Sequence, residues 1–480
     1  MKKNFIINLA ILLFVNLLVK PIYIFGIERN VQNIVGAEEF GFYFSLFNFS
    51  LLLQIILDLG TTNLNNRNIA QHEHMLGKYF SNIVGLKFIL AVFYAIISLS
   101  IAFIIGYEPR QLKLLSLLIF NQFLASFVLY LRSNISGMHL FKTDSIISVL
   151  DRLLMIIILS IIIWGNVTKS PLKIEWFVFA QTGSYGLTAL VAFLIVLKRS
   201  AFFKPRFNIK FFLVFLKESY PYALLILLMA FYNKIDSIML ERILPDGKEQ
   251  AGVYAQAFRL LDAFSMIAYL FSVLLLPMFA RMIKNKEPIE ELAKLSSLIL
   301  IIPSIILASA CHMYNFEIMD IMYIEHVERS APILSFLMTG FIGISTTYIF
   351  GTLLTANGSL KQLNIMAASG MVINILLNLI LIPKLYAQGS AIASMITQLF
   401  TAFTQVLIAA YIFKFRINYL LIGKIMVFAV LSFIINHWVY LHISNWLIAI
   451  STGITLCILL AFFLRIFTIK AIIKILKYDT

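Results

Sequence analysis

Long apolar runs separated by short polar segments recur along the whole chain. Most of them have the length of about 20 residues that an α-helix needs to cross the hydrocarbon core of a bilayer. Apolar and polar residues do not alternate within the runs, so the pattern favours helices over the strands of a membrane β-barrel. The runs predict fourteen membrane-spanning helices, at residues 4–27, 40–58, 79–106, 111–131, 146–164, 174–197, 211–234, 252–279, 293–314, 331–355, 361–382, 387–413, 418–440 and 445–467.

A short pattern, E-x-x-G-x-Y-x-x-x-F, occurs at residues 38–47 and again at 249–258, a constant offset of 211 residues. Each copy opens the second apolar helix of its half of the chain. A repeated position of this kind indicates an internal duplication of six spans. Because six is an even number, both halves begin on the same side of the membrane and the repeats are parallel.

The duplication predicts a lobe at 1–205, a second lobe at 206–416 and an appended helix pair at 417–480. The two six-helix lobes are expected to surround a central cavity with access that alternates between the two sides of the membrane. The last two spans are poor in charge, so they are expected to lie at the periphery. The fold class is therefore an all-α integral membrane protein with about fourteen transmembrane helices.

Composition agrees with this assignment. Of the 480 residues, 61% are hydrophobic and only 13% are charged, which excludes an ordinary soluble protein. The first run follows Lys2 and Lys3 and has no small-residue cleavage site after it, so a retained helix is expected. Cys311 and Cys457 lie in or beside different runs and are expected to be core residues, with no disulfide or metal framework.

The formal net charge of +15 is spread unevenly between the two sides of the membrane, and this bias indicates the orientation of the chain. Sorting Lys and Arg by side places 25 on the side of the N-terminus, 9 on the opposite side and 4 within spans. Since cytoplasmic loops carry the basic excess, both termini are expected in the cytoplasm. The charge therefore requires no nucleic-acid partner.

Ionisable residues inside the spans are the first candidates for function, because an isolated charge at membrane depth costs several kcal/mol. Arg259 and Asp262 are three residues apart, hence on one helical face. They are either a structural pair or a cargo site in which Arg259 contacts phosphate. Lys20, before Pro21 in the first span, either faces the cavity opposite Arg259 or extends its amine outward to the interface.

Further candidates have two interpretations each. Lys87 either neutralises Asp58 on the neighbouring span or contacts cargo, and Arg29, in the first outer loop, is either a topology charge or a residue at the cavity mouth. Acidic residues that would bind a coupling ion or form ion pairs are Asp262, Asp58 and Asp236. A polar face of the twelfth span would either join helices or contact sugar; it includes Thr397, Thr401 and Gln398.

Several enzyme motifs are absent from the sequence. There is no G-x-x-x-x-G-K-[ST] phosphate loop, no G-x-S-x-G and no H-E-x-x-H. The outer loops are too short for a domain that would polymerise or transfer sugars. The sequence thus indicates a transporter rather than an enzyme, with no cofactor and no metal expected.

Diffuse motifs along the first twelve spans carry a resemblance to a known family. They are VGAEEFGFYF at 35–44, DLG at 58–60, KIDSIML at 234–240, GVYAQAFRLLD at 252–262, and NLILIP with QGSAIAS at 378–394. Together they resemble the polysaccharide-unit flippases, the exporters of O-antigen and capsule units. These belong to a superfamily with multidrug/toxic-compound extruders and the peptidoglycan-precursor flippase.

The resemblance implies a bundle of six plus six helices with two peripheral ones. It also implies movement of an undecaprenyl-pyrophosphate-linked oligosaccharide across the bacterial cytoplasmic (inner) membrane, for surface polysaccharide biosynthesis. Polysaccharide polymerase and ligase machinery would be further partners, besides membrane lipids. Cationic cavity residues, which suit pyrophosphate, would be Arg259, Lys20, Lys87 and Arg29.

Two related functions stay open as alternatives: a peptidoglycan-precursor flippase and a cation-coupled multidrug exporter. The drug extruders tend to carry a carboxylate in the first helix. The predicted first helix, at 4–27, has Lys20 and no acid, which favours an anionic cargo.

Overall fold

The computed structural model describes residues 15–62, 65–66, 69, 76–138, 140–165, 171–200, 209–415 and 418–466. The regular elements in these ranges are all helical, and eleven of the helices are long and apolar enough to cross a membrane. The predicted all-α membrane fold is confirmed. The longest helix, α13 (Leu360–Phe413), contains two predicted spans that meet at Tyr386, where φ is 51° and ψ is −136°.

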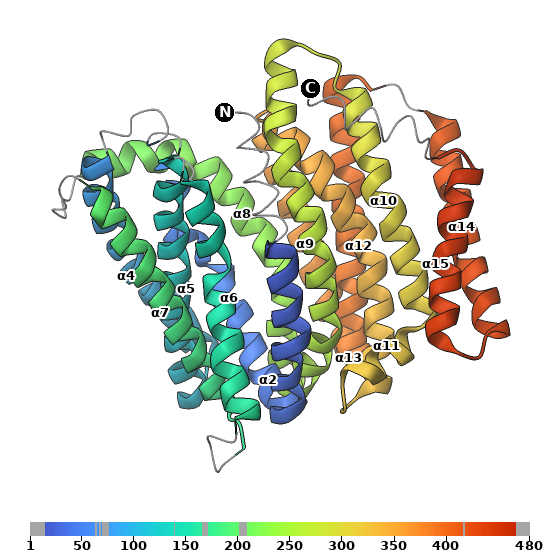
Figure 1. Cartoon of the computed structure of the whole chain (residues 1–480), viewed down its shortest axis with the longest axis horizontal. Helices are drawn as coiled ribbons and strands as arrows, with labels where there is room; N and C mark the ends of the chain where they lie inside the picture. The colour runs from blue at the N-terminus through green and yellow to red at the C-terminus, as the bar shows by residue number, and fades with distance from the viewer. Residues whose placement is uncertain are drawn as a thin grey trace. The chain divides into compact units, whose positions relative to one another are not determined.

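The chain divides into two compact units, Met1–Gly252 and Val253–Thr480. The first unit contains η1 (Ile22–Glu28), α2 (Arg29–Leu52), η2 (Gln54–Leu57), α4 (Leu76–Ile105), α5 (Pro109–Gly137), α6 (Phe141–Trp164), α7 (Ile174–Arg199), α8 (Ile209–Ile243) and the start of α9 (Gly247–Asn285) (Figure 1). The second contains the rest of α9, α10 (Glu290–Met313), α11 (Asn315–Met322), α12 (Val327–Ala356), α13, α14 (Tyr419–His442) and α15 (Trp446–Phe463). The division thus falls inside α9, and the predicted lobe limits at 205 and 416 stay predictions.

In the first unit, α5 packs against α2, α4, α6 and α7. Its sequence explains this position, since small and polar residues such as Ser126 and Ser133 are buried among large apolar ones. A core of buried side chains from α4 to α7 includes Phe80, Tyr130 and Ile147. This packing places the polar residues of α5 beside the loop that follows η2.

The first helix extends further than the sequence indicates. Glu28 and Arg29, predicted to lie in an outer loop, are helical, and the backbone leaves helical geometry only at Gly36, with φ 84° and ψ 167°. The helix continues through Gly26 to Gly36, and the widened π-helical turn of η1 follows the proline, which lacks a donor. The predicted span 4–27 contains no acid, but the helix that the structure shows runs on through Glu28, which is 4% exposed, so the first helix does carry a buried carboxylate.

The two copies of the repeated motif meet where α2 crosses the start of α9. A Cβ atom on Gly41 would lie 1.9 Å from the Lys248 carbonyl oxygen, and one on Gly252 would lie 1.8 Å from the Ala37 carbonyl oxygen. Ala37 and Lys248 are themselves one repeat offset apart, so the contact is reciprocal. The following aromatic pairs also match: the Tyr43–Phe47 rings lie 5.6 Å apart at 24°. The Tyr254–Phe258 rings lie 5.6 Å apart at 26°. This geometry supports the internal duplication.

Gly252→Ala is therefore expected to destabilise the protein by about 1–3 kcal/mol, the usual cost of overpacking, because the added methyl meets backbone atoms. The matched control is Gly183→Ala in α7, where a Cβ would meet nothing within 4 Å. Thermal unfolding in detergent measures both variants. Equal midpoints for Gly252→Ala and the unaltered protein would refute the close crossing.

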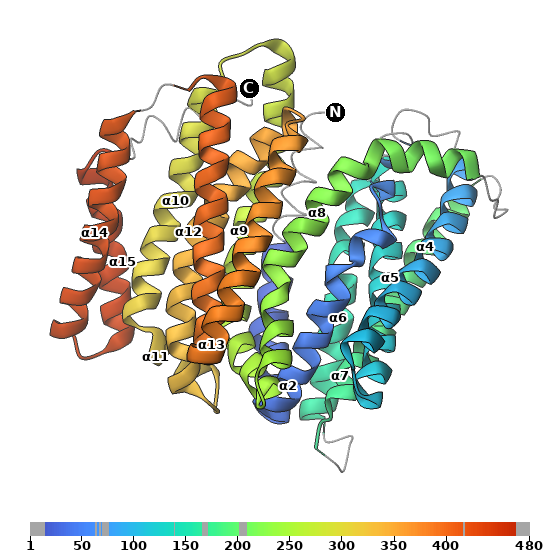
Figure 2. The same cartoon turned by 180° about the vertical axis from the view of Figure 1, so that it is seen from behind.

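In the second unit, α12 packs against α10 and α13, whereas α14 and α15 pack against α10 and each other. Asn436 of α14 donates from Nδ2 to Ser309 Oγ of α10 at 3.0 Å, a buried polar contact that sets the docking of the pair. Both views show α14 and α15 on the outer side of α10 (Figures 1 and 2). The last two spans thus form the outermost pair of the second unit.

Candidate functional site

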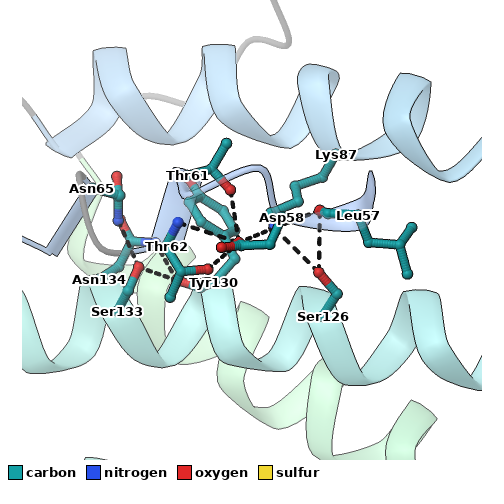
Figure 3. A network of polar contacts seen from close by, with 10 residues as sticks. All are labelled: Leu57, Asp58, Thr61, Thr62, Asn65, Lys87, Ser126, Tyr130, Ser133 and Asn134. Atoms are coloured by element: carbon teal, nitrogen blue, oxygen red, sulfur yellow. Dashed lines mark hydrogen bonds and ion pairs between the residues drawn. The ribbon is translucent and has the colours of Figure 1, made fainter. Parts of the chain in front are cut away.

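A buried network joins Lys87 of α4 to the end of η2 (Figure 3). Its Nζ donates to Asp58 Oδ1 at 2.7 Å, to the Leu57 carbonyl at 2.8 Å and to Ser126 Oγ at 3.2 Å. The Lys87 side chain is 1% exposed. Since an ammonium group has three donors, these three contacts satisfy it.

Asp58 is held from its other side by the residues that follow it. It accepts hydrogen bonds from the Thr61 hydroxyl at 2.9 Å, from the Thr62 backbone N–H at 3.3 Å and from the Thr62 hydroxyl. The chain reverses between them through left-handed geometry at Leu59 (φ 43°) and Gly60 (φ 82°). The pair expected from the sequence is present, and it fastens the end of the second span. A contact between Lys87 and a phosphate stays a prediction.

Arg259 and Asp262 form the second polar feature, in the part of α9 that belongs to the second unit. Arg259 lies twelve residues after the helix start at Gly247, which is roughly 18 Å along the axis. Its Nη1 lies 3.5 Å from Asp262 Oδ2, and the two side chains are 10% and 35% exposed. A strong charge-assisted hydrogen bond is about 2.7–2.9 Å long, so this pair is loose.

A third polar feature lies in the first unit, at residues that the sequence does not single out as a site. Arg152 of α6 lies over the rings of Tyr23 at 4.8 Å and Tyr185 at 5.8 Å, with Asp151 Oδ2 3.7 Å from its Nε. Lys20 lies close enough to interact electrostatically with Asp151 and Arg152. The sequence feature that could have indicated this site is the adjacent pair Asp151 and Arg152 within the apolar run at 146–164.

The other predicted site residues lie in several places. Arg29 is half-buried at the first position of α2, and Asp236 is 1% exposed in α8. Neither placement tests the expected role.

The polar face of the twelfth span lies against α12. Thr397 and Thr401 are fully buried and donate to carbonyls of their own helix, at Ala393 and Gln398. A Cβ on Gly343 of α12 would lie 2.6 Å from the Gln398 carbonyl oxygen. These contacts favour the interhelical interpretation, and a sugar contact stays a prediction.

Within the described residues, no group of three or more His, Cys, Asp and Glu side chains comes together to hold a metal ion. Cys311 and Cys457 are buried free thiols, in agreement with their expected place in the core.

Comparison with known proteins identifies the family of the chain and its fold. A family model described as "Polysaccharide biosynthesis protein" matches residues 4–283. No curated protein sequence matches the chain.

Several solved structures have the same fold. The lipid II flippase MurJ, in an inward closed conformation, is 15% identical with a TM-score of 0.72, over 96% of this chain and 99% of that one. The eukaryotic MATE transporter AtDTX14 is 15% identical with a TM-score of 0.60, over 94% and 97%. A MOP superfamily transporter from Pyrococcus furiosus is 15% identical with a TM-score of 0.60, over 86% and 96%. At these identities the likeness establishes the fold, which has two lobes.

Proposed function

The chain belongs to the polysaccharide biosynthesis protein family, and from this membership we propose that it is a flippase for lipid-linked oligosaccharides. It moves undecaprenyl-pyrophosphate-linked units, such as O-antigen units, from the cytoplasmic to the outer leaflet by alternating access. It does this in the bacterial cytoplasmic membrane, without catalysing a reaction. Both termini are cytoplasmic, and the polymerase and ligase machinery uses the exported units.

The observation that carries the proposal is Arg259, a cation far inside a membrane-spanning helix with a loosely placed acid beside it. At such depth a guanidinium is expensive unless it faces water, an acid or a phosphate. Guanidinium donors match phosphate oxygens two at a time, so a pyrophosphate competes well against a carboxylate at 3.5 Å. Lys20 is the second candidate for phosphate contact, and Arg29 the third.

One observation favours a second function. Glu28 is a buried acid in the first helix, and a carboxylate there is typical of the cation-coupled drug extruders. A drug exporter would raise resistance to toxic cations on overexpression, and Glu28→Gln would abolish that resistance.

The experiment that tests the proposal is deletion of the gene followed by analysis of the lipid-linked glycans of the cytoplasmic leaflet. We expect an undecaprenyl-pyrophosphate oligosaccharide to accumulate and purified protein in vesicles to flip it. Accumulation of the peptidoglycan precursor would show the alternative flippase instead. Unchanged glycans together with drug sensitivity would overturn the proposal in favour of an exporter.

A further inference from the structure

Arg152 lies at the middle of a helix that crosses the membrane. It is eleven residues after the start of α6, roughly 16 Å along the axis. Its side chain is nevertheless 27% exposed, and that of Asp151 is 22% exposed. Charged side chains at this depth avoid lipid, so the exposed part of the pair faces a water-accessible space.

Two tyrosines from other elements orient the guanidinium. Tyr23 of η1 is 4% exposed and Tyr185 of α7 is 7% exposed, and the guanidinium carbon lies over both rings. Such cation–π contacts are strongest where water is excluded. These two contacts restrict the orientations open to the guanidinium, although the Arg152 side chain stays 27% exposed. The arginine is therefore preorganised, at a π-helical turn of the kind frequent at functional sites.

The charges around Arg152 balance. Lys20 and Arg152 are cationic, whereas Asp151 and Glu28 are acidic, and all four lie close enough to interact electrostatically with Arg152 or Lys20. Arg132 also acts on Lys20, but its own charge is neutralised by Asp144, whose Oδ1 lies 2.7 Å from the Arg132 Nε. A phosphate site needs an excess of cations, and a sodium site needs an excess of acids. This cluster instead offers donors from Arg152 beside acceptors from Asp151, which suits a neutral ligand rich in hydroxyl groups.

We propose that Arg152 and Asp151 bind a sugar of the cargo and determine which saccharides are exported. This inference rests on the proposed function, in which Arg259 contacts the pyrophosphate. Arg152 donates to the sugar oxygens with its planar fork, and Asp151 accepts from a neighbouring hydroxyl. Since a site built to hydrogen-bond a hydroxyl rejects ligands that lack it, the pair selects among saccharides.

The test compares two lipids that differ only in the sugar: undecaprenyl-pyrophosphate oligosaccharide and sugar-free undecaprenyl pyrophosphate. Their affinities are measured for purified protein in nanodiscs, with the variants Arg152→Gln and Asp151→Asn. Arg110→Gln is the matched control, since Arg110 is an exposed arginine at the outer end of α5 that pairs with Glu39 and Glu175. Thermal unfolding of each variant verifies that it is folded.

We expect each of Arg152→Gln and Asp151→Asn to weaken binding of the oligosaccharide lipid by about tenfold or more, the effect of one lost charged hydrogen bond. Binding of the sugar-free lipid is expected to stay unchanged, as is binding of both lipids by Arg110→Gln. Equal loss for both lipids would make Arg152 a phosphate residue, and no loss for either would exclude contact; both results overturn the inference. If the unaltered protein binds neither lipid, both the proposed function and this inference are wrong.

Discussion

Arg259→Ala is expected to abolish export of the oligosaccharide lipid while leaving the protein folded in the membrane. The side chain is 10% exposed, and its Nη1 lies 3.5 Å from Asp262 Oδ2. Truncation removes the guanidinium, which would donate two hydrogen bonds to the pyrophosphate. Such charge-assisted hydrogen bonds are stronger than those between neutral groups. Losing two of them corresponds to at least about a hundredfold in binding. The remaining Asp262 is 35% exposed, so the loss of its partner leaves it hydrated and the fold intact.

Two further variants separate phosphate binding from a structural pair. Arg259→Lys keeps the charge but not the planar fork, so it should retain only part of the export. Asp262→Asn removes the acid and should export nearly as well as the unaltered protein. Flipping in vesicles and protein levels in the membrane are the measurements. Normal export by Arg259→Ala, or equal failure of Asp262→Asn, would contradict the phosphate role.

Lys87→Met is expected to have the largest effect on stability. Removing one partner of a buried ion pair typically costs about 3–5 kcal/mol, because the other charge stays uncompensated. The lower end of this range applies, since the Asp58 side chain is 29% exposed and water reaches it. The variant also leaves the Leu57 carbonyl and Ser126 without the ammonium donor.

Unfolding in detergent and the yield of folded protein measure this loss. The double variant Lys87→Met/Asp58→Asn should recover part of the stability, because it removes the uncompensated charge. Lys113→Met, at an exposed position of α5, is the control and should change stability by less than about 0.5 kcal/mol. If Lys87→Met unfolds like the control, the network does not hold the end of the second span.

Most of the fold follows from local properties of the sequence. The length of the apolar runs identifies the membrane-spanning helices. Backbone N–H and C=O groups in lipid must hydrogen-bond to each other within the same segment, which a helix achieves. The repeated motif indicates the duplication, and its reciprocal contact at Gly41 and Gly252 follows from the spacing of 211 residues. The Lys87–Asp58 pair is also predictable, since both lie near the same end of neighbouring spans.

The polar centre of the first unit is not predictable in this way. Tyr23, Arg152 and Tyr185 come from three separate segments, and only tertiary packing brings their side chains together. The predicted first span ends at residue 27, before the three consecutive polar residues Glu28, Arg29 and Asn30, and so leaves Glu28 outside the helix. The helix continues there because burial inside the first unit outweighs the polar character of those three residues.

The reciprocal contact of Gly41 and Gly252 also limits how this gene can diverge. Each glycine faces main-chain atoms of the other copy, which every amino acid carries, so no substitution at the partner position makes room for a side chain. Positions in contact usually diverge together through compensating mutations, but here no second mutation can compensate for a side chain at either glycine. Selection therefore removes substitutions at either position. We expect both positions to retain glycine in descendant sequences even after the two halves have lost detectable sequence similarity.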